Sequence, residues 1–148
     1  MSKHNAHVLH WKTYVQCNAH ITAHPCYRDT NNCTVRSVKN LFDLSYPAAY
    51  EACKEFGRRH NCGYSWVGYH DTVQALAKQR GLKVERLTRG QSRRDYGKTI
   101  VSAQRRLARG ESVIFNVRGH TMSYVDGYTN DWADNRRHHI WEVWRLTP

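Results

Sequence analysis

The sequence predicts an α+β fold in which helices come first and mostly antiparallel strands follow, with the helices packed on one side of the sheet. Between residues 33 and 81, apolar residues recur at three- and four-residue steps, as on one face of a helix. Between residues 82 and 146, short alternating runs are typical of strands. The chain of 148 residues shows no repeats and suits one domain, residues 1–148, with a histidine-rich N-terminal arm at residues 1–28.

Two helices are expected early in the chain. The first begins at Cys33, with Asn31 or Asn32 as its N-cap, because a small amide side chain satisfies the free N–H groups of a helix start. Its predicted apolar positions are Cys33, Val35, Val38, Leu41 and Phe42. The second helix is expected after Ser45, with a proline in its first turn, and ends at Gly57.

A third helix is expected further on. Residues 57–70 contain glycines and aromatic residues, which favours a loop. The helix then begins at Asp71 or Thr72 and continues to Arg80, where the following glycine would close it.

The C-terminal half predicts strands around one more helix. Residues 82–87 alternate as a strand does, and residues 96–108 have the apolar spacing of a helix. Residues 112–117 and 139–146 are expected to be strands. Between them, Asp126-Gly127 is a strong signal for a two-residue hairpin turn.

The chain is strongly basic, with 23 Lys and Arg against 12 Asp and Glu, a formal charge of +11. Such a balance points to an anionic partner: nucleic acid, an acidic protein, or an anionic wall or membrane surface. The arginine pairs are scattered along the chain rather than gathered in one tail. We therefore expect a generally basic, solvated surface, with a dedicated nucleic-acid groove as the alternative.

The cysteines indicate a reducing environment. There are five, an odd number, and the first twenty residues do not form a signal peptide. No stretch is long and apolar enough for a membrane span. We expect the protein in the host cytoplasm or in a virion assembled there.

No cofactor is expected, and zinc is a weak alternative. The candidate ligands are Cys17, His20, His24 and Cys26. These residue types suit zinc, but their spacing matches no common zinc finger.

Cys33, His120 and Asp131 carry the strongest chemical signal. A helix N-terminus is where a thiol is most easily ionised. If Asp126-Gly127 is a tight turn, His120 lies opposite Ala133 and shares a strand face with Asp131. A histidine oriented by a carboxylate is the base that a thiol nucleophile needs. Asp134 is a second choice for the carboxylate.

Candidate oxyanion donors lie next to the thiol. The backbone N–H of Cys33 is one, and the side-chain amide of Asn31 or Asn32 is the other.

Four short motifs follow one another along residues 30–146: NNCTVRSV, SYPAAYEACKEFGRR, RGHTMSYVDG and YTNDWAD. They place a cysteine at an expected helix start, a tyrosine-containing helix that ends in Gly-Arg, a Gly-His pair before an apolar strand, and an Asp-Trp pair in the last motif. This ordered set resembles the papain-like cysteine peptidases, especially the small bacteriocin-processing branch, and more closely small bacteriophage proteins of that type.

The resemblance implies a papain-like core over residues 30–146 and a thiol hydrolase or its inactive relic. Cys33 takes the position of the nucleophile, His120 that of the base and Asp131 that of the orienting residue. Tyr27 stands where the family carries its oxyanion glutamine, so one of the amides named above, or Gln16 from the arm, would replace it.

The sequence therefore predicts a cysteine-dependent peptidase or amidase that acts on a peptide, an acidic protein or a cell-wall substrate. One alternative is a catalytically inactive viral structural or interaction protein that contacts virion or host proteins. The other is a basic nucleic-acid-binding module.

Overall fold

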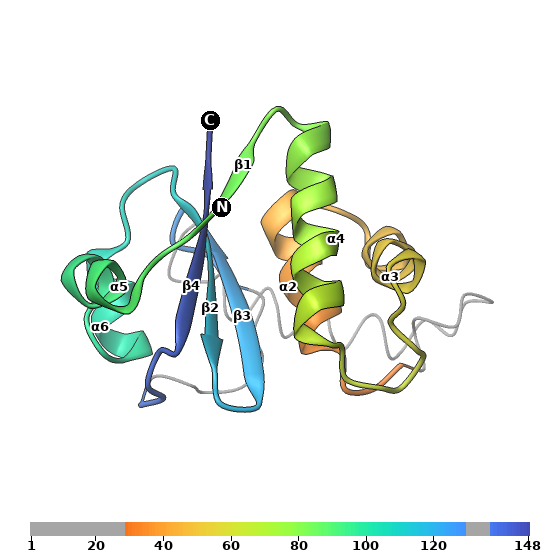
Figure 1. Ribbon diagram of the computed structural model, residues 1–148, viewed down its shortest axis with the longest axis horizontal. Helices are drawn as coiled ribbons and strands as arrows, with labels where there is room; N and C mark the ends of the chain where they lie inside the picture. The colour runs from red at the N-terminus through yellow and green to blue at the C-terminus, as the bar shows by residue number, and fades with distance from the viewer. Residues whose placement is uncertain (1–28, 130–136) are drawn as a thin grey trace.

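The computed structural model describes residues 29–129 and 137–148 (Figure 1). The predicted α+β class is confirmed, with an antiparallel sheet of four strands in these residues. In chain order the elements are α2 (Cys33–Phe42), α3 (Tyr46–Glu55), α4 (Trp66–Gln79), β1 (Lys83–Arg86), α5 (Arg89–Tyr96), α6 (Ile100–Arg106), β2 (Ser112–Val117), β3 (His120–Val125) and β4 (Glu142–Thr147). The N-terminal arm lies outside the described residues.

The first two helices begin where the capping residues predict. Asn32 is the N-cap of α2, although its side-chain amide donates to the hydroxyl of Tyr46 rather than capping the helix. Ser45 caps α3, because its hydroxyl accepts the N–H of Ala48 at 3.2 Å. After α3 the chain turns at Gly57, whose φ of +106° is favourable only for glycine.

Helix α4 begins earlier than the start predicted at residues 71–72. It begins at Trp66, and its N-cap is Ser65, whose hydroxyl accepts the N–H of Gly68 at 3.1 Å. In the sequence this glycine favours a loop. In the structure it makes room for a neighbouring ring, since a Cβ there would lie 2.4 Å from Cε1 of Tyr64.

The single helix predicted over residues 96–108 is wrong, because two short helices, α5 and α6, occupy this region. They are separated at Gly97, whose φ is +80°. A Cβ at this glycine would lie 2.1 Å from Oγ of Ser102, so the close turn requires glycine. The hydroxyl of Thr99 then caps the second helix by accepting the N–H of Ser102.

The strand order in the sheet is β1-β4-β2-β3, and all neighbouring strands are antiparallel. Strands β2 and β3 form a hairpin in which Val117 pairs with His120. The two residues between them, Arg118 and Gly119, form the turn, and Gly119 has a φ of +70°. This turn is absent from the sequence-based predictions.

The predicted turn at Asp126-Gly127 is confirmed. Val125 and Tyr128 bridge across it. Both turn residues have positive φ, +52° and +83°, as a two-residue hairpin turn of this type requires. The predicted pairing of His120 with Ala133 falls beyond the described residues.

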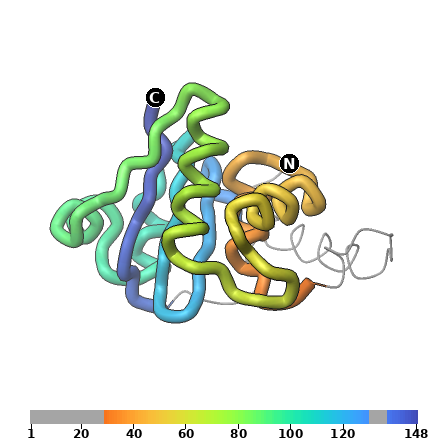
Figure 2. The backbone as a smooth tube through the Cα atoms, turned by 45° about the vertical axis from the view of Figure 1, so that its right-hand side comes forward, coloured from red at the N-terminus to blue at the C-terminus, as the bar shows by residue number. Residues whose placement is uncertain are grey.

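Helices cover both faces of the sheet, so the prediction of helices on one side only is wrong (Figures 1 and 2). Ile114 packs with α2, α3 and α4, whereas Val113 and Phe115 pack with α5 and α6. The reason lies in β2, in which five consecutive residues are buried. A strand that is apolar on both faces needs a layer on each.

Candidate active site

The starts of α2 and β3 lie together because the two elements run side by side in the same direction. The hydroxyl of Ser123 donates to the carbonyl of Ser37 at 2.8 Å, and the amide of Asn40 donates to the carbonyl of Ser123 at 3.0 Å. Four helical residues advance about 6 Å, and two strand residues advance about 6.6 Å. Ser37 lies beside Ser123, so Cys33, four residues earlier in the helix, lies beside Thr121, two residues earlier in the strand.

Cys33 is half-buried at the first position of α2, and its surroundings favour the thiolate. Burial raises the pKa of the thiol and is the largest single influence. A hydrogen bond with the side chain of His120, the charge of that imidazole, and bonds from the backbone N–H groups of Thr121 and Thr34 act in the opposite direction. Together they hold the pKa of Cys33 below its ordinary value of 9.0.

His120 is placed by the β2–β3 hairpin. It is the first residue of β3 and directly follows the turn glycine Gly119. Its side chain is half-buried, which leaves it open to solvent and to a bound molecule. A two-residue turn fixes the position of the strand start. The hairpin thus holds the imidazole beside the thiol of Cys33.

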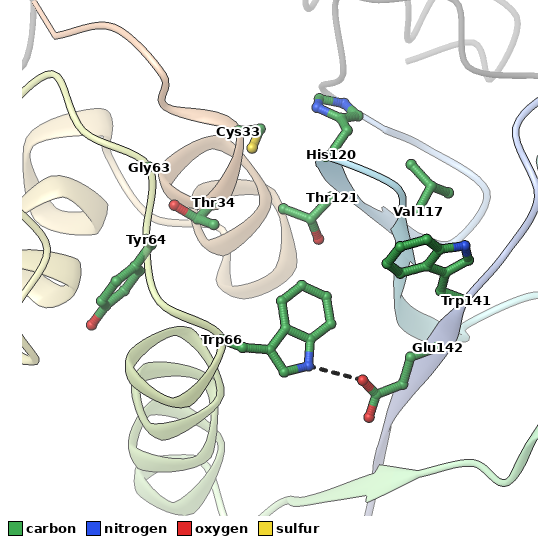
Figure 3. Close-up of a pocket in the computed structure, with 11 residues that line it drawn as sticks. Cys33, Thr34, Gly63, Tyr64, Trp66, Val117, His120, Thr121, Trp141 and Glu142 are labelled. Carbon is green, nitrogen blue, oxygen red and sulfur yellow. Dashed lines mark hydrogen bonds between the residues drawn. The ribbon is translucent and has the colours of Figure 1, made fainter.

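A pocket of about 630 Å³ opens beside this pair (Figure 3). Its lining residues come from the N-terminus of α2, the loop before α4, the β2–β3 hairpin and the start of β4: Cys33, Thr34, Gly63, Tyr64, Trp66, Val117, Gly119, His120, Thr121, Trp141 and Glu142. Cys33 and His120 lie at one end, with Trp66 and Trp141 further along. The space is large enough for a side chain of a substrate.

One wall of the pocket is fixed by a chain of polar contacts. The indole N–H of Trp66 donates to Glu142 at 3.0 Å (Figure 3), and Arg86 binds the other carboxylate oxygen at 2.6 Å. Burial raises the pKa of Glu142, but these bonds outweigh it and hold the pKa below its ordinary value. Trp141 is 65% exposed, an unusual position for so large an apolar side chain.

The candidate oxyanion amides are engaged elsewhere. The side-chain amide of Asn31 donates to the carbonyl of Asn61 at 3.0 Å, and that of Asn32 donates to Tyr46. Neither residue lines the pocket. The backbone N–H of Cys33 belongs to the first turn of α2, where N–H groups have no acceptor within the helix. It remains the candidate donor next to the thiol.

A buried ion pair anchors the segment that leads into α2. Arg58 lies 2.7 Å from a carboxylate oxygen of Asp29, and both side chains are almost fully buried. The same guanidinium donates to the carbonyls of Thr30 and Asn31 at 3.0 and 3.2 Å. The N–H of Asn61 donates to the other carboxylate oxygen. These bonds fix the approach of the chain to the helix that begins at Cys33.

The other described cysteines differ from Cys33. Cys53 is fully buried in the core, and burial raises the pKa of its thiol to about 12. Cys62 is exposed, and all three thiols are free. The pKa of the Cys33 thiol is therefore lowered, whereas that of the Cys53 thiol is raised.

Several predicted residues lie outside the described parts of the chain. These are Asp131, Asp134, Gln16, Tyr27 and the weak zinc candidates Cys17, His20, His24 and Cys26. Within residues 29–129 and 137–148, no group of three or more His, Cys, Asp or Glu is arranged to hold a metal ion. None of the helices described there is long and apolar enough to cross a membrane.

Three residues that shape the site could not be identified from the sequence. Arg58 is half of an arginine pair, which suggests a solvated surface, although it also belongs to the Gly-Arg motif of the resemblance. Trp141 and Glu142 fall in the run of residues 139–146 that predicts a strand, where nothing marks them as pocket residues. Tyr64 and Trp66 come from residues 57–70, where the glycines and aromatic residues predict a loop, and both line the pocket.

Comparisons with protein-family models, with curated proteins and with solved structures find no match for this chain.

Proposed function

We propose that the protein is a cysteine-dependent hydrolase, a peptidase or amidase of the papain-like type. The observation that carries the proposal is the meeting of the Cys33 thiol with the His120 imidazole at one end of the pocket. A thiol at a helix start, hydrogen-bonded to histidine, is the arrangement that produces a nucleophilic thiolate at neutral pH.

Each step of the reaction has a group in the site. The Cys33 thiolate attacks the carbonyl carbon of an amide, and the backbone N–H of Cys33 donates to the oxyanion that forms. The His120 imidazolium gives its proton to the leaving nitrogen, so the C–N bond breaks and a thioester remains. His120 then takes a proton from water, which attacks the thioester and releases the acid and the thiolate.

The rest of the site supports this assignment. The positive end of α2 favours an anion at its first residue. Cys53, by contrast, is kept as a thiol by burial. The pocket walls include Trp66 and Trp141, which supply apolar surface on which a substrate chain can pack.

Asp131 is proposed as the residue that orients His120, with Asp134 as the alternative. The variants Asp131→Asn and Asp134→Asn distinguish between these two candidates. The orienting carboxylate is the one whose removal lowers the rate of Cys33 alkylation at pH 7, because it stabilises the imidazolium beside the thiolate.

The proposal is tested by incubating the protein with a proteome-derived peptide mixture and with cell-wall peptides, followed by mass spectrometry for new termini. Wild-type protein should produce cleavage products that are absent with Cys33→Ala and with His120→Ala. Cys62→Ser is the matched control, because this exposed thiol has no place in the pocket. Products that persist in Cys33→Ala, or no Cys33-dependent product in either mixture, would overturn the proposal.

A further inference from the structure

The excess positive charge of the protein is concentrated on the α5–α6 unit, residues 89–110. This stretch contains seven Lys and Arg and one acidic residue, Asp95, a net of +6 out of +11 for the chain. The seven cationic residues are all exposed: Arg89, Arg93, Arg94, Lys98, Arg105, Arg106 and Arg109. The scattered basic surface expected from the sequence is therefore uneven in the folded protein.

The two helices present these charges as one surface. Ser92 and Tyr96 of α5 and Ile100 and Ala103 of α6 are buried, so the exposed positions of both helices face outward. At the turn between the helices, Arg106 reaches across and donates to the backbone carbonyl of residue 94 at 3.4 Å. This surface covers the sheet face opposite α2 (Figure 1), away from the helix that carries Cys33.

The carboxylates of this region are already engaged. Asp95 contacts Arg94 at 3.2 Å and Arg145 at 3.5 Å. Glu111 accepts from the hydroxyl of Tyr96 and from the N–H of Ala108. No described hydrogen bond or ion pair engages five of the cationic side chains: Arg89, Arg93, Lys98, Arg105 and Arg109. Like charges held this closely repel one another unless an anion lies among them.

We propose that the α5–α6 surface binds the phosphate backbone of nucleic acid. Six of the seven cations are arginine, whose planar guanidinium matches phosphate with two parallel hydrogen bonds. An acidic protein partner would need apolar anchors at the centre of its interface. The exposed large apolar side chains of the described residues are Phe56, Trp66, Val67 and Trp141, all outside this unit. Binding through phosphates is independent of base sequence.

The test uses the full-length protein and two fluorescent 20-base-pair duplexes of unrelated sequence, with binding followed by anisotropy between 50 and 200 mM salt. Five phosphate contacts give a slope of about −4.5 in log affinity against log salt, a loss of about 500-fold over this range. Both duplexes should bind with the same affinity. The triple variant Arg93→Gln, Arg105→Gln and Arg109→Gln should reduce the slope to about −2.

The matched control removes the same charge from the opposite side of the molecule: Lys54→Gln, Arg59→Gln and Lys78→Gln. These three residues are also exposed, but they belong to the α3–α4 side. The control should keep a slope near that of wild type. Circular dichroism and the rate of Cys33 alkylation establish that each variant is folded.

Three outcomes would overturn the proposal. Equal losses in both triple variants would show that only the overall charge matters. If polyglutamate displaced the labelled duplex as effectively as unlabelled duplex does at the same concentration of negative charge, the surface would be assigned to an acidic protein. Binding to vesicles containing anionic lipid, without binding to duplex, would assign it to a membrane surface.

Discussion

Removing the guanidinium of Arg58 should destabilise the protein far more than removing that of its neighbour Arg59. Arg58 and Asp29 form a buried pair at 2.7 Å, whereas Arg59 is exposed. Arg58→Ala leaves the buried carboxylate of Asp29 without its guanidinium partner, a loss of about 3–5 kcal/mol for a buried ion pair. The carbonyls of Thr30 and Asn31 lose their donor in the same step. Arg59→Ala should change the free energy of unfolding by no more than about 0.5 kcal/mol.

Urea unfolding followed by circular dichroism measures the difference. With a slope of about 1.5 kcal/mol/M, Arg58→Ala should lower the midpoint by about 2–3 M and leave the slope unchanged. The double variant Asp29→Ala with Arg58→Ala should lose less stability than the sum of the single variants, because no unpaired charge remains. An Arg58→Ala protein within about 1 kcal/mol of wild type would refute the reasoning.

Three further predictions concern the turns, the core thiol and the pocket wall. Gly97→Ala should destabilise the protein more than Gly110→Ala, because both glycines have a φ of +80° but only the Cβ at residue 97 meets another side chain; equal urea midpoints would contradict this. Cys53, whose pKa is raised to about 12, should resist iodoacetamide at pH 8 until the protein unfolds, and peptide mass spectrometry would reveal any earlier labelling. The lowered pKa of Glu142 means that its carboxylate stabilises the fold above pH 4.5 and that this contribution is lost as the pH falls through the folded-state pKa. Glu142→Gln should therefore destabilise the protein at pH 7 but less so at pH 3 in urea titrations, and an equal loss at both pH values would exclude this role.

Local signals were sufficient for several elements of the fold. The start of α3 follows from Ser45, and the turn at Asp126-Gly127 follows from residues that accept positive φ. Strand β2 has the predicted bounds because its apolar run ends at a charged residue and a glycine. These features depend on residues next to one another in the sequence.

The wrong predictions concern elements whose structure is determined by tertiary packing. Gly68 lies inside α4 because the ring of Tyr64 packs against it, a contact that the sequence pattern does not contain. Gly97 divides one predicted helix into two for a similar reason, its closeness to Ser102. The second helical layer follows from the burial of β2 on both faces, which an alternating-strand interpretation misses.

In the candidate site, too, some features follow from the sequence and others depend on tertiary structure. Residue type and chain order point to Cys33 and His120, and the structure brings the two together. The burial of Arg58 and the exposure of Trp141 depend on tertiary structure, since the sequence favours the reverse for each. The clustering of charge on α5 and α6 likewise depends on which arginines face outward.

The central claim is that Cys33 is an ion-paired nucleophile, and the pH dependence of its alkylation tests this most directly. Iodoacetamide is applied to wild type and to His120→Ala across pH 4–10, and peptide mass spectrometry separates Cys33 from the other thiols. We predict an apparent pKa below that of a free cysteine in wild type, and a return toward the free-cysteine value in His120→Ala. A Cys33 that titrates like a free thiol in both proteins, or that does not react in either, would contradict the claim.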